Sequence, residues 1–118
     1  MNVLITGTSC GIGKAIAEKY LSCGHIVYGI DRLPSAIQET EYTHYESDIL
    51  KGSLPKLPPI EILINNAGVQ DSGEDIDINL KGTIRITEAY AIQENIKSVL
   101  FIASASAQTG AEFPEYAA

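Results

Sequence analysis

The chain has 118 residues, 45% of them apolar and 19% charged, which suits one globular domain and excludes intrinsic disorder. Its 15 acidic and 8 basic residues give a net charge of −7, which argues against binding to nucleic acid. No apolar run approaches the roughly 18 residues of a membrane span, and the apolar start has no basic flank, so neither a membrane segment nor a secretory signal is expected.

The first thirty or so residues have the pattern of a strand, a helix and a second strand. Residues 2–5 form a short, β-branched apolar run, which is typical of a buried strand. Apolar side chains then recur at helical spacing and predict a buried helix face: Ile12, Ala15, Ile16 and Tyr20. Gly24 is suited to end this helix, and residues 25–30 predict the second strand. A strand–helix–strand unit of this length requires parallel pairing.

Two further strands are expected before residue 66. Residues 34–40 hold at most a short helix, and residues 42–46 are typical of a third, more polar strand. Prolines at 55, 58 and 59 mark a connector, which explains this segment better than its match to a PxxP ligand pattern. Residues 60–64 predict the fourth strand, which closes on Asn65.

The rest of the chain predicts one helix and a fifth strand. Apolar or small side chains at helical spacing trace the helix: Ile76, Leu80, Ile84, Thr87 and Ala91. This helix is expected to end near Asn95, residues 98–102 predict the fifth strand, and residues 103–118 have no strong period. Strands that alternate with helices predict an α/β fold, in which helices cover both faces of a parallel sheet.

The strongest local feature is the run Thr6–Gly13, which follows a strand and opens a helix. Glycines here permit positive φ and let the backbone approach a pyrophosphate, while the helix N-terminus supplies N–H groups and partial positive charge. The residues expected to bind a dinucleotide in this loop are Gly7, Ser9, Cys10, Gly11, Ile12 and Gly13. A tight turn that merely needs glycine has the same pattern, so the loop alone leaves both interpretations open.

Asp31 favours the dinucleotide interpretation. It lies 18 residues after Gly13, at the end of the second strand, where a carboxylate can accept hydrogen bonds from an adenosine ribose diol. Its charge would repel the 2′-phosphate of NADP, and no Lys or Arg lies among residues 8–10 to bind that phosphate. We therefore predict NAD(H) in preference to NADP(H), although Arg32 would pair with a 2′-phosphate if Asp31 turned away.

Five motifs, in this order, resemble those of the short-chain dehydrogenase/reductase (SDR) family. They are Thr6-Gly7-x-x-x-Gly11-Ile12-Gly13, Asp48-Ile49, Asn65-Asn66-Ala67-Gly68, Asn79-Leu80-Lys81-Gly82 and Ile102-Ala103-Ser104. The resemblance spans the whole chain. It implies a Rossmann-type doubly wound parallel sheet, of which the chain covers about the first five strands, and reversible hydride transfer between a nicotinamide, here predicted to be that of NAD(H), and a carbonyl or alcohol substrate. The segments 31–48 and 68–79 are shorter than is usual for the family, so their helices are expected to be reduced or missing.

The resemblance also implies roles for the residues that follow the third and fourth strands. Asp48 would bind the adenine amino group and Ile49 would line the adenine pocket. The turn formed by Asn66, Ala67 and Gly68 would lie beside the nicotinamide ribose. Each motif has a simpler alternative, because Asp48 could cap a helix and the asparagine-rich segment could be only a turn that ends a strand.

Three residues match the family's catalytic positions. Asn79 lies inside a predicted helix, where Asn is mildly unfavourable, and it would anchor a water that relays protons; a solvent-facing Asn is the alternative. Ser104, preferred over its rival Ser106, would polarise the substrate oxygen. Tyr116 would be the acid/base, and the gap of 12 residues from Ser104 suits the family.

The family's Tyr-x-x-x-Lys motif is incomplete, because the lysine would occupy the second position beyond Ala118. Residues 1–118 are therefore expected to be an NAD(P)-binding Rossmann domain that is truncated inside this motif, and the stretch alone is expected to be inactive. Without the lysine, only about one tyrosine in a thousand is ionised at pH 7. The first hypothesis is an oxidoreductase as the parent protein, which would be a homo-oligomer. The alternative is a truncated, non-catalytic module that binds dinucleotides or another protein.

The cysteines and histidines indicate little chemistry. Cys10 and Cys23 fit neither a disulfide framework nor a zinc site, so a reduced, cytoplasmic protein is the simplest interpretation. His25 and His44 lie in predicted strands and have no second ligand at a useful spacing, so no metal site is expected. Beyond a small-molecule carbonyl or alcohol, the sequence does not identify the substrate.

Overall fold

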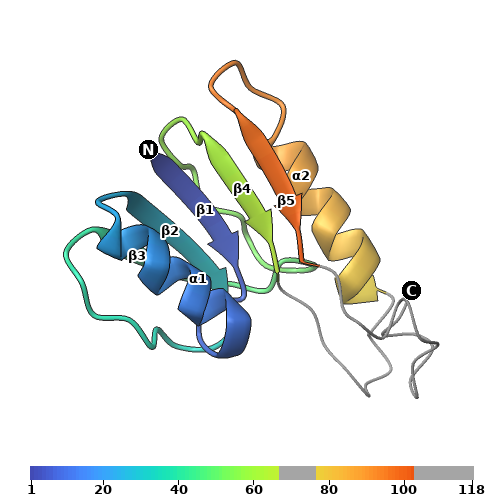
Figure 1. Cartoon of the computed structure of the whole chain (residues 1–118). Coiled ribbons are helices and arrows are strands. Elements are labelled where there is room, and N and C mark those ends of the chain that lie inside the picture. Colours follow the sequence, from blue (N-terminus) through green and yellow to red (C-terminus); the bar gives the residue numbers. More distant parts are fainter. Residues whose placement is uncertain (67–76, 103–118) are drawn as a thin grey trace, which may run out of the picture.

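A computed structural model describes residues 1–66 and 77–102, in which five parallel strands form one sheet with the order β3-β2-β1-β4-β5 (Figure 1). The strands are β1 (Asn2–Thr6), β2 (Ile26–Asp31), β3 (Tyr42–Glu46), β4 (Ile62–Asn65) and β5 (Ser98–Phe101). The helices are α1 (Gly11–Ser22), the π-helical turn η1 (Asp77–Gly82) and α2 (Thr83–Tyr90). The prediction of a Rossmann-type parallel sheet is confirmed.

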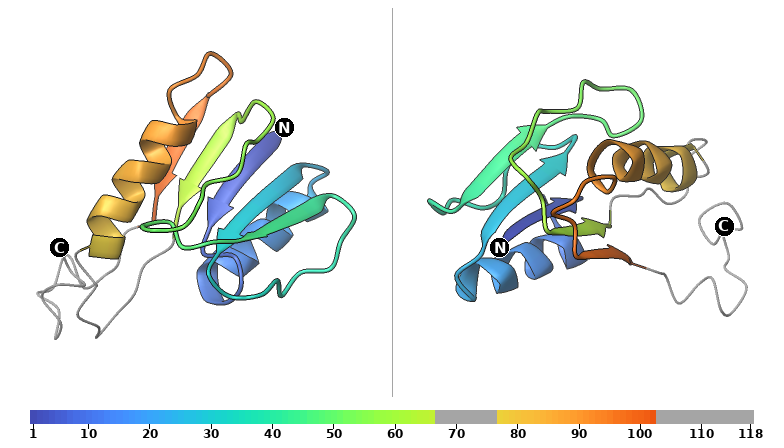
Figure 2. Two further views of the ribbon diagram at one scale, coloured as in Figure 1. Left: turned by 180° about the vertical axis from the view of Figure 1, so that it is seen from behind. Right: turned by 90° about the horizontal axis from the view of Figure 1, so that it is seen from above.

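The two main helices lie on opposite faces of the sheet, which Figure 2 shows in the view from above. Successive side chains of β1 alternate between these faces: Val3 and Ile5 belong to the α1 side, whereas Leu4 belongs to the α2 side. The α1-side core contains Val3, Ile5, Ala17, Val27, Ile37, Tyr42 and Ile64. The α2-side core contains Leu4, Ile30, Ile49, Ile60, Leu63, Ile86 and Tyr90. Both faces of the central strands are therefore buried, as their uninterrupted apolar runs predict.

The connection between β2 and β3 contains no helix, since residues 34–39 have no regular structure. The Ser35 hydroxyl donates to the carbonyl of Ile37 (2.9 Å) and accepts from its N–H (3.3 Å), bonds that compete with helical pairing. The third strand runs over the predicted residues 42–46, whereas the fourth begins at Ile62, two residues later than predicted. Ile60 is nevertheless fully buried, and its N–H donates to Oε1 of Gln93 (3.1 Å).

The predicted buried face of α1 is partly wrong. Ile12 is 61% exposed and Ala15 is also exposed, while Gly13 and Ala17 are the buried residues of this helix. Ile16 and Tyr20 are half-buried at the margin of the core. The helix approaches the sheet through its smallest residues, because only these let the two backbones come close.

The predicted stripe of the second long helix is also wrong at two residues, and a third, Ile76, lies outside the described residues. Leu80 and Ile84 are 55% and 47% exposed, whereas Ile86 and Tyr90 are buried. A π-helical turn holds more residues per turn than an α-helix, so η1 rotates the side chains that follow it relative to a 3.6-residue repeat. The helix also ends at Tyr90, short of the predicted Asn95.

Candidate functional site

The glycine-rich loop follows β1 at the carboxyl edge of the sheet, where all five strands end (Figure 1). Gly7 has φ 77° and Gly11 has φ 61°, so the loop uses the left-handed region twice, as glycine allows. The N–H of Gly7 donates to the carbonyl of Ile30 (2.8 Å), which joins the loop to the neighbouring strand β2. The loop is thus a folded turn with a fixed attachment to the sheet.

Gly13 is the point at which α1, the loop and the end of β4 meet. A Cβ atom at this position would lie 1.9 Å from the carbonyl oxygen of Gly7 and 2.4 Å from Nδ2 of Asn66. Asn66 also binds the loop: its Nδ2 donates to the Gly7 carbonyl (3.2 Å) and its N–H donates to Oγ1 of Thr6 (3.0 Å). Gly13 therefore permits a packing that no other residue type would.

The N-terminus of α1 presents an uncompensated positive end. Cys10 precedes the helix without a side-chain hydrogen bond to it, and the first turn contains no acidic residue. A Cβ atom on Gly11 would meet nothing within 4 Å, so the space above this amide is open. The first N–H groups of a helix have no partner within the helix, and they attract anions. This end of α1 therefore has the chemistry of a phosphate-binding site.

Asp31, at the end of β2, is held against the glycine loop. Its Oδ2 accepts a hydrogen bond from the N–H of Ser9 (3.0 Å), and its Oδ1 accepts one from the N–H of Leu33 (2.9 Å). The Ser9 hydroxyl shares its one hydrogen between the carbonyls of Leu33 (3.2 Å) and Pro34 (2.8 Å). Each carboxylate oxygen has a second lone pair, so Asp31 can accept further hydrogen bonds from a ligand. Arg32 is exposed beside it.

A chain of polar side chains that the sequence analysis did not predict lies beneath the loop. Thr8 is fully buried, and its Oγ1 lies 2.6 Å from the hydroxyl of Tyr42. That hydroxyl lies 2.7 Å from Nδ1 of His44, whose Nε2 lies 2.9 Å from the carbonyl oxygen of Leu33. Burial, and to a smaller extent the Asp31 charge, raise the pKa of Tyr42. The signal in the sequence was a pair of polar aromatic residues two positions apart on one strand, and thus on one face.

Asp48 follows β3 and shapes a turn. Its Oδ1 accepts hydrogen bonds from the N–H groups of Leu50 (2.8 Å) and Lys51 (3.3 Å), so it organises a turn and not the helix cap considered above. Ile49 is 6% exposed and belongs to the α2-side core, where it lies against Gly82. The guanidinium of Arg85 donates to the Ile49 carbonyl (3.1 Å). The predicted contacts of Asp48 and Ile49 with adenine stay predictions.

Four predicted site residues lie outside the described residues: Ala67, Gly68, Ser104 and Tyr116. The backbone of Asn79 belongs to η1, the irregular turn that precedes α2. The predicted roles of Asn79 and of these four residues therefore stay predictions.

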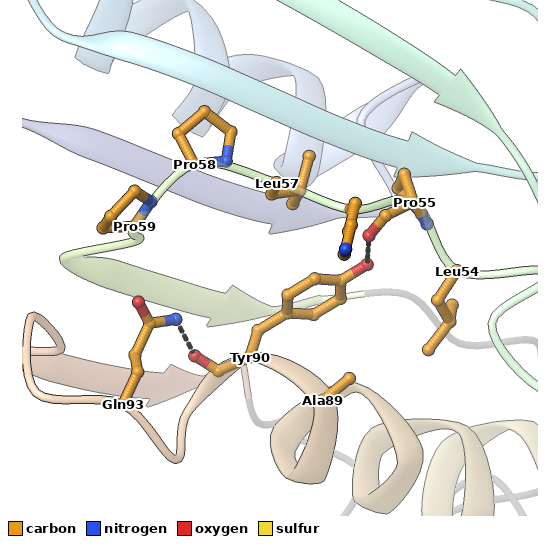
Figure 3. Close-up of a pocket in the computed structure, with 9 residues that line it drawn as sticks. Leu54, Pro55, Leu57, Pro58, Pro59, Ala89, Tyr90 and Gln93 are labelled. Atoms are coloured by element: carbon orange, nitrogen blue, oxygen red, sulfur yellow. Dashed lines mark hydrogen bonds between the residues drawn. The ribbon is translucent and has the colours of Figure 1, made fainter.

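A hollow lies on the α2 side of the sheet (Figure 3). It has a volume of about 420 Å³ and lies between the proline-rich connector and the end of α2. The Tyr90 hydroxyl donates to the carbonyl of Pro55 (2.5 Å), and burial raises the pKa of Tyr90 to about 12. Gln93 continues the wall, since its Nε2 donates to the Tyr90 carbonyl. This hollow contains none of the predicted site residues.

Two further properties concern the part of the chain that the structure describes. Within 1–66 and 77–102, no cluster of three or more His, Cys, Asp or Glu side chains could hold a metal ion. No helix in those ranges is long and apolar enough to cross a membrane.

Comparison with known proteins gives consistent results. A family model for short chain dehydrogenases matches residues 1–118. An uncharacterized oxidoreductase of Schizosaccharomyces pombe is 30% identical over 142 residues, which cover 98% of this chain and 54% of that protein. The ligand-free aldohexose dehydrogenase of Thermoplasma acidophilum is 26% identical with a TM-score of 0.79, over 98% of this chain and 54% of that one. A short chain dehydrogenase/reductase family oxidoreductase from Burkholderia thailandensis shares the fold, with a TM-score of 0.83 at 20% identity over 98% of this chain and 56% of that one. The chain thus spans about half the length of the relatives that it matches.

Proposed function

Because the chain belongs to the short-chain dehydrogenase family, we propose that it is the NAD(H)-binding part of an oxidoreductase that acts on a carbonyl or alcohol. In this proposal residues 1–118 form a Rossmann domain, and the glycine loop binds the pyrophosphate. The observation that carries the proposal is the position of Asp31, whose carboxylate is fixed at the loop by the N–H of Ser9 (3.0 Å). The helix end that would bind the pyrophosphate and the carboxylate that would bind the ribose thus lie at the same edge of the sheet.

The structure of the glycine-rich loop supports this proposal. The pyrophosphate would receive hydrogen bonds from the first N–H groups of α1, and the open space above Gly11 allows its approach. Ser9, Cys10 and Ile12 would line this site, with Gly7 and Gly13 shaping it. At the other end of the site, Asp48 would bind adenine through Oδ2, since both of its turn-forming hydrogen bonds use Oδ1.

We also propose a preference for NAD(H) over NADP(H). Asp31 accepts two backbone N–H groups and retains acceptor capacity for the 2′- and 3′-hydroxyls of a ribose. A 2′-phosphate would instead bring two negative charges close together. Arg32 is the one neighbouring cation in the segment 31–34, and it would have to outweigh that repulsion for NADP(H) to bind.

The catalytic roles are proposed from the family's motif. When bound, the nicotinamide ring donates or accepts the hydride. Ser104 would hydrogen-bond the substrate oxygen, Tyr116 would exchange a proton with that oxygen, and Asn79 would hold the relay water. Asn66, Ala67 and Gly68 would contact the nicotinamide ribose. Proton exchange by Tyr116 would require a neighbouring lysine, as the motif implies.

The same reasoning extends to assembly and location. Leu80 and Ile84 are 55% and 47% exposed, and they supply apolar surface of the kind that a homo-oligomer buries. Cys10 and Cys23 are both free and exposed, which suits the reducing cytoplasm.

The test compares Asp31→Asn with Glu46→Gln. Glu46 is the matched control, because it is an exposed carboxylate at the end of β3 and pairs in register with Asp31. Titration of NADH and NADPH, followed by nicotinamide fluorescence, should show tighter NADH binding by the wild-type chain. Asp31→Asn should lower this preference at least tenfold, the cost of about one charged hydrogen bond, and Glu46→Gln should not change it. Tighter NADPH binding by the wild type would contradict the cofactor assignment.

Turnover tests the second half of the proposal and is measured on the natural protein that contains this chain, with a panel of alcohols and carbonyls. NAD(H)-dependent turnover that is lost in Ser104→Ala and Tyr116→Phe is the expected result. Dinucleotide binding without turnover on any substrate would favour the alternative, a non-catalytic binding module.

A further inference from the structure

The chain of side chains from Thr8 through Tyr42 to His44 joins the glycine loop to the segment that follows Asp31. Its three contacts are short, at 2.6, 2.7 and 2.9 Å, and it ends on the carbonyl oxygen of Leu33. None of these side chains takes part in the binding or chemistry proposed above. These contacts could therefore serve to fix the shape of the site.

The direction of the hydrogen bonds follows from the last acceptor. A carbonyl oxygen only accepts, so Nε2 of His44 carries the hydrogen and donates it to Leu33. In the neutral ring Nδ1 then accepts, which makes the Tyr42 hydroxyl a donor to His44. The Tyr42 oxygen in turn accepts from the hydroxyl of Thr8. With a neutral His44 ring, each group therefore has one role in the chain.

The interior of the protein is shaped around this contact. A Cβ atom on Gly29, in β2, would lie 2.0 Å from the Tyr42 hydroxyl and 2.4 Å from Oγ1 of Thr8. Thr8 is fully buried and Tyr42 is 9% exposed, so neither hydroxyl could replace its partner with bulk water at no cost. Any side chain at position 29 would displace the Thr8–Tyr42 contact.

The far end of the chain acts on the residues that surround Asp31. The Leu33 carbonyl accepts from His44 and also from the hydroxyl of Ser9 (3.2 Å), while the Leu33 N–H donates to Asp31 (2.9 Å). The peptide groups of Leu33 are thus fixed by β3 on one side and by the glycine loop on the other. The orientation of the Asp31 carboxylate depends on both attachments.

We propose that Tyr42 and His44 are positioning residues that hold the Asp31–Leu33 segment ready for the adenosine ribose of NAD(H). The inference rests on the proposed function, because it assigns these residues to the ribose end of that site. Neither residue touches the cofactor. Their contribution is to fix the segment before binding, so that less ordering is needed when the nucleotide arrives.

The test measures the dissociation constants of NADH and ADP-ribose by calorimetry. Tyr42→Phe and His44→Leu should each weaken both ligands by about threefold to tenfold, the range of one hydrogen bond, and by the same factor for the two. Equal factors place the effect in the ADP-ribose part, which the two ligands share and which contains the adenosine ribose, and exclude an effect at the nicotinamide. His44→Gln keeps an N–H that can reach the Leu33 carbonyl, and it should restore most of the affinity.

Tyr90→Phe is the matched control for a general loss of stability. It removes another hydrogen bond of a buried tyrosine hydroxyl, on the opposite face of the sheet, and should lower the melting temperature without changing either dissociation constant. Nitrogen-15 NMR of the wild-type chain without nucleotide gives an independent signature, namely the Nε2–H tautomer of His44.

The outcomes separate the two proposals. A wild-type chain that binds neither ligand would overturn the proposed function and this inference together. A wild-type chain that binds both, with Tyr42→Phe and His44→Leu unchanged, would overturn only this inference. The Nδ1–H tautomer, or an equal loss of affinity in Tyr90→Phe, would also overturn it.

Discussion

Gly13→Ala separates the close packing of the glycine loop from ordinary helix propensity, because the two effects have opposite signs. In a helix interior, Ala is about 1 kcal/mol more favourable than Gly, so propensity alone predicts a gain in stability. The new Cβ, however, would lie 1.9 Å from the Gly7 carbonyl oxygen and 2.8 Å from its carbon, and both atoms belong to the backbone. Relief of this clash must move α1 away from the loop.

The magnitude follows from measured costs of overpacking, which run from about 1 to 3 kcal/mol. The short distances to backbone atoms place Gly13→Ala near the upper end, at about 2 kcal/mol after the gain in propensity. A chain of 118 residues has an unfolding entropy of roughly 250 cal/mol/K, so each kcal/mol shifts the melting temperature by about 4 °C. We expect a decrease of about 8 °C.

The assay is thermal unfolding followed by circular dichroism, with NADH titration on the same samples. Gly24→Ala is the control, because Gly24 has φ 86° and open space around its Cβ position, so this substitution adds backbone strain without a clash. It should lower the melting temperature and leave NADH affinity unchanged, whereas Gly13→Ala should reduce both. An unchanged or higher melting temperature for Gly13→Ala would refute the packing argument.

Three further outcomes are expected. Tyr90→Phe should lower stability by about 1 kcal/mol through loss of the bond to Pro55, as urea unfolding would show. Burial raises the pKa of Tyr90 to about 12, above the value of about 10 in the unfolded chain. The stability contributed by the neutral phenol is therefore complete below pH about 10 and is lost as the pH rises through 12. Urea unfolding across this pH range should show a smaller loss of stability for Tyr90→Phe than for the wild type. Phe101→Lys, on the exposed edge strand β5, should reduce self-association in light scattering. Ile92→Lys is the control and should not reduce it, because Ile92 is 81% exposed but lies outside the sheet.

The sequence predicted the strands of this fold better than the faces of its helices. Strands 2–5 and 42–46 were recognisable because β-branched and aromatic residues cluster in them, and the observed β1 and β3 agree with these ranges within one residue. The α1 face differs from the prediction because the buried residues of this helix are the small Gly13 and Ala17 and not its large apolar residues. The α2 face was misjudged because no local pattern revealed the π-helical turn.

The candidate site also contains parts that the sequence predicted and parts that it did not. The glycine loop and Asp31 were predictable, since their positions in the chain follow from parallel-sheet topology. The contact of Thr8 with Tyr42 was not, because these residues lie 34 positions apart and come together only through the pairing of β1 with β2 and of β2 with β3. A sequence pattern records which residues share a strand face, but not which buried hydroxyl lies opposite.

The lack of a side chain at Gly29 restricts which residues can occur together at positions 8, 29 and 42. Since a Cβ there would lie 2.0 Å from the Tyr42 hydroxyl and 2.4 Å from Oγ1 of Thr8, a mutation at residue 29 can be accepted only if both neighbours become smaller. Among descendants of this sequence, a larger residue at position 29 should therefore appear only where positions 8 and 42 hold smaller residues. In an alignment of its closest homologues, these three columns should covary even though the residues are widely separated along the chain.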